Sequence, residues 1–214
     1  DYFSDIISPI LGKIIFDYNY VDASKDGVIT DFCLINAFAP MIEDESEDYD
    51  DLTKKISKRI GTLGGFDKSD QQLKILFFKR ARIVNESINR IPLAINILKN
   101  FSREKWLIFS ETKKQANDLN YHLNKQGFRS EVYNSDLGTR IRHSVLRQFK
   151  DGILDVVVSC KCLDEGFDLP DIDGALILSG STTIRQRIQR MGRALRKSKS
   201  KDNALIATIY SSDD

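Results

Sequence analysis

The feature that most constrains the fold is a series of short apolar runs in the second half of the chain. The runs are "WLIFS" from Trp106, "LDVVVSC" up to Cys160, "GALILSG" up to Gly180 and "NALIATIY" up to Tyr210. Polar residues hardly alternate with apolar ones in them, which is typical of strands that are buried on both faces. Such strands, when separated by helical segments of about ten to fifteen residues, predict a parallel sheet with helices on both sides.

The segments between these runs fit that interpretation. Amphipathic helices are predicted over residues 112–127 and 138–152, each ending on a glycine, with a further strand over residues 129–134. The predicted fold class is therefore α/β. A parallel sheet of this kind binds ligands beyond the carboxyl ends of its strands. We expect a site directly after the runs that end at Ser110, Cys160 and Gly180.

The first half of the chain has a different pattern. The apolar stretches Lys13–Val21 and Phe32–Ala39 are rich in β-branched and aromatic residues, so they are predicted to pair as strands or to flank a short loop. Apolar residues at helical spacing from Gln71 to Phe101 predict a helix that breaks or kinks at Pro92. We expect residues 1–104 to form a connecting segment that packs on an α/β domain of residues 105–214.

Charge is distributed unevenly although the chain is almost neutral. The first 51 residues have a net charge of −11, and the remainder has a net charge of +12. Residues Glu43–Asp51 include seven carboxylates among nine residues, which predicts a solvated, mobile loop, with a metal or partner site as the alternative. A basic second half is compatible with a face that binds a polyanion.

Several classes of protein are disfavoured. No apolar run is long enough to span a bilayer and no signal peptide is recognisable, so we expect a cytoplasmic protein, or a nuclear one in a eukaryote, without a membrane partner. The two histidines, His122 and His143, lie far apart on predicted helices and indicate no metal site. Residues Gly61–Asp70 have the composition of a phosphate-binding loop, but they lack the GxxxxGK[ST] spacing and follow no strand.

The most basic segment is "IRQRIQRMGRALRKSKSK", residues 184–201, with eight basic residues among eighteen and no acidic one. As a helix it would present one apolar stripe to the sheet, formed by Ile184, Ile188, Met191 and Leu195. Arg193 and Arg196 would then lie as a pair beside Gly192. A guanidinium donates hydrogen bonds in a fork that fits phosphate oxygens. The alternative is a basic helix that is solvated or paired with the acidic first segment.

Four blocks of the second half resemble motifs of superfamily 2 helicases. "QRMGRALR", Gln189–Arg196, resembles motif VI, QxxGRxxR, and "CLDEGFDLPDID", Cys162–Asp173, resembles motif V. "WLIFSET" resembles motif IV, and residues 139–159 resemble the helix and strand that precede motif V. The order and spacing also agree with the family, and the similarity is greatest to XPB-type translocases and to the helicase subunits of restriction and defence systems. The resemblance implies the second RecA-like domain of such a protein.

The resemblance also implies an ATP site that is shared with another domain. In the family, ATP with Mg²⁺ is held mainly by the N-terminal RecA-like domain of the same polypeptide. The second domain approaches the nucleotide from the other side. By position, Arg193 and Arg196 would be the catalytic arginine fingers, and Gly166, Asp168 and Gln189 would bind ATP.

A second set of positions would bind nucleic acid, and the resemblance favours DNA over RNA. The matching residues are Ser110, Ser135, Ser159, Cys160 and Lys161. Contacts of this kind position a sugar-phosphate backbone without reading its sequence. Cys160 stands where the family usually has a hydroxyl residue. A thiol is a weak donor, so we expect a backbone amide or Ser159 to make the contact there.

The resemblance predicts the C-terminal motor domain of an ATP-dependent helicase or translocase. Residues 1–214 contain no P-loop, so they are predicted to be inactive by themselves. The alternative is a degenerate RecA-like module that binds or scaffolds without ATPase activity. A third interpretation is a basic nucleic-acid binder that does not depend on ATP.

Overall fold

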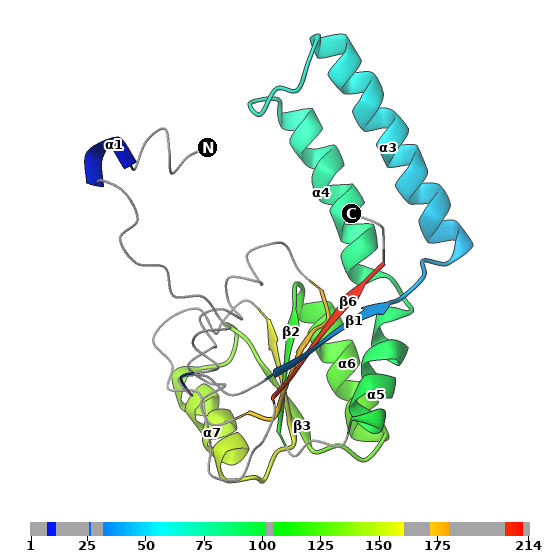
Figure 1. The fold of residues 1–214 in the computed structure, drawn as a ribbon. Helices are drawn as coiled ribbons and strands as arrows, with labels where there is room; N and C mark the ends of the chain where they lie inside the picture. Colours follow the sequence, from blue (N-terminus) through cyan, green and yellow to red (C-terminus); the bar gives the residue numbers. More distant parts are fainter. Residues whose placement is uncertain are drawn as a thin grey trace.

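The computed structural model describes residues 8–11, 26, 32–101, 105–160, 172–179 and 204–211. At its centre is a six-stranded sheet in the order β1-β6-β5-β2-β4-β3, in which every pairing is parallel (Figure 1). The strands are β1 (Phe32–Phe38), β2 (Trp106–Ser110), β3 (Ser130–Tyr133), β4 (Val156–Cys160), β5 (Gly174–Ile177) and β6 (Ala204–Tyr210). The predicted parallel sheet is confirmed. A four-residue helix, α1 (Ser8–Leu11), lies near the amino terminus.

Helices cover both faces of the sheet, as the apolar runs predicted. Alternate residues of β2 belong to two different buried clusters, because successive side chains of a strand point to opposite faces. Trp106 and Ile108 pack with α5 (Arg90–Asn100) and α6 (Lys113–Lys125). Leu107 and Phe109 pack with α7 (Thr139–Lys150) on the other face. The result is a three-layer α/β/α arrangement.

Strand β1 comes from the first half of the chain but belongs to the same sheet. It pairs in parallel with β6, from Phe32 opposite Ala204 to Phe38 opposite Tyr210. The stretch Phe32–Ala39 was predicted to pair as a strand with residues 13–21 or to flank a short loop, and its residues Phe32–Phe38 form a strand. The companion stretch, residues 13–21, lies outside the described residues. The proposed division at residue 104 stays a prediction, although one strand of the sheet lies on its amino-terminal side.

The acidic run is helical, so the prediction of a mobile loop is wrong. Its residues form the first part of α3 (Glu43–Leu63), which packs against α4 (Gln71–Glu86) as a helical hairpin that projects from the sheet (Figure 1). Three carboxylates lie in the first turn, where the helix dipole stabilises negative charge. One of them, Glu45, also accepts a hydrogen bond from the amide of Ile42 at 3.1 Å. Among the described residues no cluster of His, Cys, Asp or Glu could hold a metal ion.

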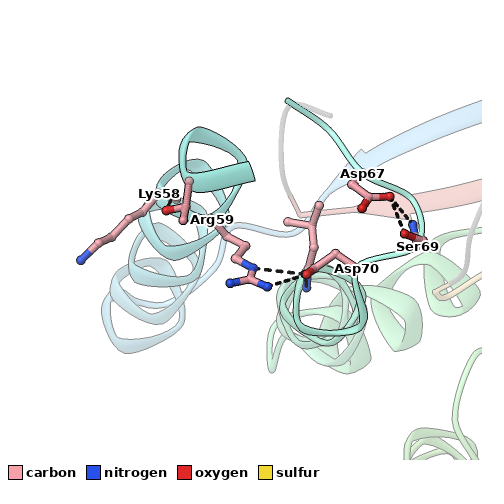
Figure 2. Close-up of polar contacts among 7 residues, drawn as sticks. Lys58, Arg59, Asp67, Ser69 and Asp70 are labelled. Carbon is pink, nitrogen blue, oxygen red and sulfur yellow. Dashed lines mark hydrogen bonds and ion pairs between the residues drawn. The ribbon is translucent and has the colours of Figure 1, made fainter. Parts of the chain in front are cut away.

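The tip of the hairpin is held by polar contacts that Figure 2 shows in detail. Asp70 accepts a hydrogen bond from the amide of Leu73 at 2.6 Å, which caps α4, and it pairs with Arg59 of α3 at 2.5 Å. Asp67 accepts from both the amide and the hydroxyl of Ser69 at 2.7 Å. Residues 61–70 are therefore the end of one helix and the turn to the next.

The break between α4 and α5 occurs earlier than the sequence predicted. α4 ends at Glu86 and α5 begins at Arg90, so Pro92 lies inside the first turn of α5. Proline is tolerated there because the first amides of a helix have no intrahelical acceptor. The prediction of a break is confirmed, but its assignment to Pro92 is wrong.

Candidate functional site

The candidate site is the carboxyl edge, the side of the sheet on which β2, β3, β4 and β5 end. Register places Ser110 opposite Cys160 and Tyr133 opposite Ser159, so the last residues of three neighbouring strands lie together. Four of the predicted nucleic-acid contacts, Ser110, Ser135, Ser159 and Cys160, come from these strand ends or the turn that follows. The structure thus brings residues from distant parts of the sequence to one edge.

Ser110 lies at this edge but its side chain is buried, with 1% of its surface exposed. Its hydroxyl lies 3.0 Å from the carbonyl of Thr112 and 3.0 Å from Oε1 of Gln115, two internal acceptors. Gln115 is itself buried. The hydroxyl of Ser110 therefore positions the start of α6, and its role toward a nucleic acid stays a prediction.

Ser159 and Cys160 are also buried, on opposite faces of β4. The thiol of Cys160 is directed at the carbonyl of Glu111, with Sγ 3.6 Å from the oxygen. The hydroxyl of Ser159 is buried, and it forms no hydrogen bond with any residue that the structure describes. Its role toward a nucleic acid stays a prediction, because the side chain is not exposed at the edge.

Ser135 is exposed, in the turn that joins β3 to α7. Asn134 stabilises this turn, because its Oδ1 accepts from the amide of Asp136 at 2.9 Å. Lys113, the first residue of α6, pairs with Asp136 at 2.5 Å. This ion pair connects the start of α6 to the turn. Ser135 therefore lies near the start of α6 at the carboxyl edge.

The amino end of α7 is a feature that the sequence reasoning missed. Gly138 precedes the helix and offers no side-chain cap, while the first turn contains no acidic residue and the exposed Arg140. The first amides of a helix have no intrahelical partner, and together with the helix dipole they favour an anion. A glycine followed by a helix with arginines in its first turn was the sequence signal for this end.

The opposite, amino-terminal edge of the sheet has a structural ion pair. Arg129 forms two side-chain hydrogen bonds with Asp155, and its amide donates to the same carboxylate at 3.0 Å. The hydrogen bond from Arg129 lowers the pKa of Asp155 below its ordinary value. This pair joins the residues that precede β3 and β4 and lies away from the candidate site.

The remaining predicted site residues lie outside the described residues. These are Lys161, Gly166, Asp168, Gln189, Arg193 and Arg196, together with the apolar stripe from Ile184 to Leu195. Their assignments stay predictions. In the part of the chain that the structure describes, no helix has the length and apolar character needed to cross a membrane.

Comparison with known proteins places the sequence among helicases. Residues 89–198 match the family model described as "Helicase conserved C-terminal domain". The "DNA 3'-5' translocase XPB2" of Sulfurisphaera tokodaii is 27% identical over 218 residues, which cover 94% of this chain and 48% of that protein. "UvrABC system protein B" of Bifidobacterium longum is 37% identical over 98 residues, covering 44% of this chain and 14% of that protein. The chain thus spans about half, or less, of these curated relatives.

Solved structures share the fold at low sequence identity. The "Sulfolobus solfataricus SWI2/SNF2 ATPase core in complex with dsDNA" superposes with a TM-score of 0.66 at 10% identity, covering 83% of this chain and 40% of that one. The C-terminal domain of the same ATPase gives 0.61 at 11% identity, covering 84% and 79%. At these identities the likeness shows the fold alone, a RecA-like arrangement.

Proposed function

The chain belongs to the helicase conserved C-terminal domain family, and on this premise we propose that it is the second motor domain of an ATP-dependent DNA helicase or translocase. The observation that supports this most directly is the carboxyl edge. It combines the amino end of α7, which has no side-chain cap, with the exposed residues Ser135 and Arg140. An edge with these groups is suited to a polyanion.

We propose that the carboxyl edge binds the sugar-phosphate backbone of the nucleic acid. The amides at the start of α7 and the hydroxyl of Ser135 would donate to phosphate oxygens, and Arg140 would add a positive charge. Ser110 would act indirectly, by positioning α6. The names of two similar proteins, a DNA translocase and an ATPase core in complex with dsDNA, favour DNA over RNA.

The ATP side of the proposal rests on the sequence motifs. Arg193 and Arg196 would stabilise negative charge on the γ-phosphate, which accelerates related phosphoryl transfers by about 10³ to 10⁵. Gly166, Asp168 and Gln189 would contact the nucleotide. Bound ATP with Mg²⁺ would supply the phosphoryl group and its charge compensation. An N-terminal RecA-like domain of the same polypeptide would hold most of the nucleotide.

The test is hydrolysis of ATP by the complete protein with Arg193→Ala or Arg196→Ala. We expect either change to abolish ATP hydrolysis stimulated by nucleic acid and to leave nucleic-acid binding largely intact. Arg147→Ala is the matched control, because Arg147 is an exposed arginine that forms a weak ion pair with Asp151 at 3.7 Å.

Two results would contradict this proposal. Wild-type turnover by either alanine variant would exclude the arginine-finger role. A complete protein that binds nucleic acid but hydrolyses no ATP would favour the degenerate module. Residues 1–214 alone should show no significant turnover, since they contain no P-loop.

A further inference from the structure

The last turn of α4 has carbonyl groups that accept hydrogen bonds from side chains outside the hairpin. A helix leaves its final carbonyls without intrahelical partners. The carbonyl of Val84 accepts from Nε of Arg90 at 2.6 Å, and the carbonyl of Asn85 accepts from Nε2 of Gln115 at 2.6 Å. Arg90 is the first residue of α5, and Gln115 lies in the first turn of α6. The end of the hairpin therefore depends on two residues of the core.

Arg90 extends this connection to two strands. Its Nη1 donates to the carbonyl of Leu178 at 2.6 Å and to the carbonyl of Ile209 at 2.7 Å, at the carboxyl ends of β5 and β6. The side chain is buried, and this burial lowers the pKa of Arg90 to about 10 against the opposing effect of Glu45. The guanidinium is thus still charged at neutral pH, and its hydrogen bonds go to carbonyls of three separate segments.

Gln115 makes the second connection to the carboxyl edge. Its Oε1 accepts from the hydroxyl of Ser110 at 3.0 Å and from that of Ser179 at 2.5 Å. The hydroxyl of Ser179 in turn accepts from the amide of Glu111 at 2.9 Å. One amide side chain therefore bridges α4 to the ends of β2 and β5. In the sequence, Ser179 is followed by the segment with Arg193 and Arg196.

The first turn of α3 closes the arrangement. Glu45 accepts from the hydroxyl of Ser87 at 2.9 Å and from the amide of Ile88 at 2.8 Å. Both helices of the hairpin are thereby fixed where they meet the core. We call this set the polar junction: Glu45, Ser87, Arg90, Ser110, Gln115 and Ser179. All of these residues except Glu45, which is partly exposed, are buried. Displacing one buried polar group would leave its partner without a hydrogen bond, so the junction resists gradual deformation.

We propose that Arg90 and Gln115 are positioning residues that couple the helical hairpin to the carboxyl edge of the sheet. A displacement of α4 moves the acceptors of both side chains, so it must alter their bonds to the ends of β2, β5 and β6. Neither residue needs to touch ATP or nucleic acid. The inference rests on the proposed motor function. It adds a series of hydrogen bonds that connects the hairpin to the end of β5, after which the sequence continues to Arg193 and Arg196.

The test compares Gln115→Met with Ser130→Ala in the complete protein. Methionine has nearly the volume of glutamine but cannot donate or accept in its place. Ser130 is a matched control, since it is buried and hydrogen-bonded to Asn120 and Asn124, yet lies at the amino end of β3. Arg90→Lys is the second variant, because it keeps the charge and loses the forked donors. The measurements are kcat and KM for ATP with nucleic acid, nucleic-acid affinity, Tm and hydrogen exchange.

We expect Gln115→Met and Arg90→Lys to lower the stimulated kcat by about tenfold, with KM and nucleic-acid affinity changed by less than about threefold. Ser130→Ala should lower Tm by about as much as Gln115→Met and keep the kcat of the wild-type protein. Hydrogen exchange should increase together in the last turn of α4 and at residues 110–112 and 177–179. A kcat for Gln115→Met equal to that of Ser130→Ala would overturn the coupling.

The hydrogen-exchange measurement separates failure of this inference from failure of the proposed function. If the wild-type protein shows no stimulated ATPase activity, the proposed function fails. Hydrogen exchange in Gln115→Met then tests the coupling across the polar junction without reference to ATPase activity. Faster exchange on both sides of the junction supports the coupling, and faster exchange confined to α6 overturns it.

Discussion

The sheet and the helical hairpin are stabilised in different ways. All five residues of β2 and all five of β4 are buried, and in the described part of the chain α5, α6 and α7 cover the two faces. In the hairpin, α3 buries only Ile56 and α4 only Leu73, while Phe78 is 74% exposed. Apolar burial therefore dominates in the sheet, whereas caps, an ion pair and the polar junction hold the hairpin. Equivalent substitutions should have unequal effects in the two regions.

The largest difference is expected for loss of an apolar side chain. Leu119 on α6 is fully buried between helix and sheet, so Leu119→Ala should lower the free energy of unfolding by about 2–5 kcal/mol. Ile75 on α4 is 51% exposed, and Ile75→Ala should change it by about 0.5 kcal/mol or less. Urea unfolding followed by circular dichroism measures both. Similar losses for the two variants would contradict the comparison.

Two glycines sharpen the comparison at a smaller scale. A Cβ added to Gly174 of β5 would lie 2.6 Å from the ring of Trp106, so Gly174→Ala should destabilise the protein by about 1–3 kcal/mol. A Cβ on Gly61 of α3 would meet nothing within 4 Å. Gly61→Ala should therefore stabilise the hairpin by about 0.5–1 kcal/mol, because alanine favours the helix. Thermal unfolding tests both, and a stabilised Gly174→Ala would show that β2 and β5 are packed differently.

The smallest effect is expected from protonation of Asp70. Its hydrogen bond from Arg59 lowers the pKa of Asp70 below 3.8, so the carboxylate stabilises the tip of the hairpin at neutral pH. This contribution is present above the ordinary pKa and is lost as the pH falls through the lowered one. NMR titration of the Leu73 amide should report a midpoint below 3.8. The transition should be absent from Asp70→Asn, and a midpoint at or above 3.8 would contradict the pairing.

The fold of the second half was largely predictable because its signals are local and repeated. Apolar runs predicted β2, β4, β5 and β6, and helical periodicity predicted α6 and α7 within a few residues. The acidic run was wrongly predicted to be a loop, because a high density of carboxylates is typical of solvated loops. Its helix depends on contacts with α4 and on Glu45, whose partners Ser87 and Ile88 are 42 and 43 residues away in the sequence.

The candidate site was predictable only in part. The resemblance named Ser110 and Ser135, whose roles stay predictions. No sequence pattern indicates that the hydroxyl of Ser110 is directed at Gln115, or that Ser159 is fully buried. Those properties depend on side-chain direction and on neighbours from other strands. Gly138 was a weak sequence signal for the amino end of α7. It can be interpreted only once the start of the helix is known.

The sequence by itself determined the parallel α/β sheet, the helices that follow β2 and β3, and the resemblance to superfamily 2 helicases. These follow from periodicity and from motifs that lie within short stretches of chain. Only the tertiary structure decided that β1 joins the sheet beside β6 and that the acidic run is a helix. It also decided that Arg90 and Gln115 connect the hairpin to the carboxyl edge. Buried polar contacts between distant residues depend on the exact placement of donors and acceptors, and that placement exists only after the chain has folded.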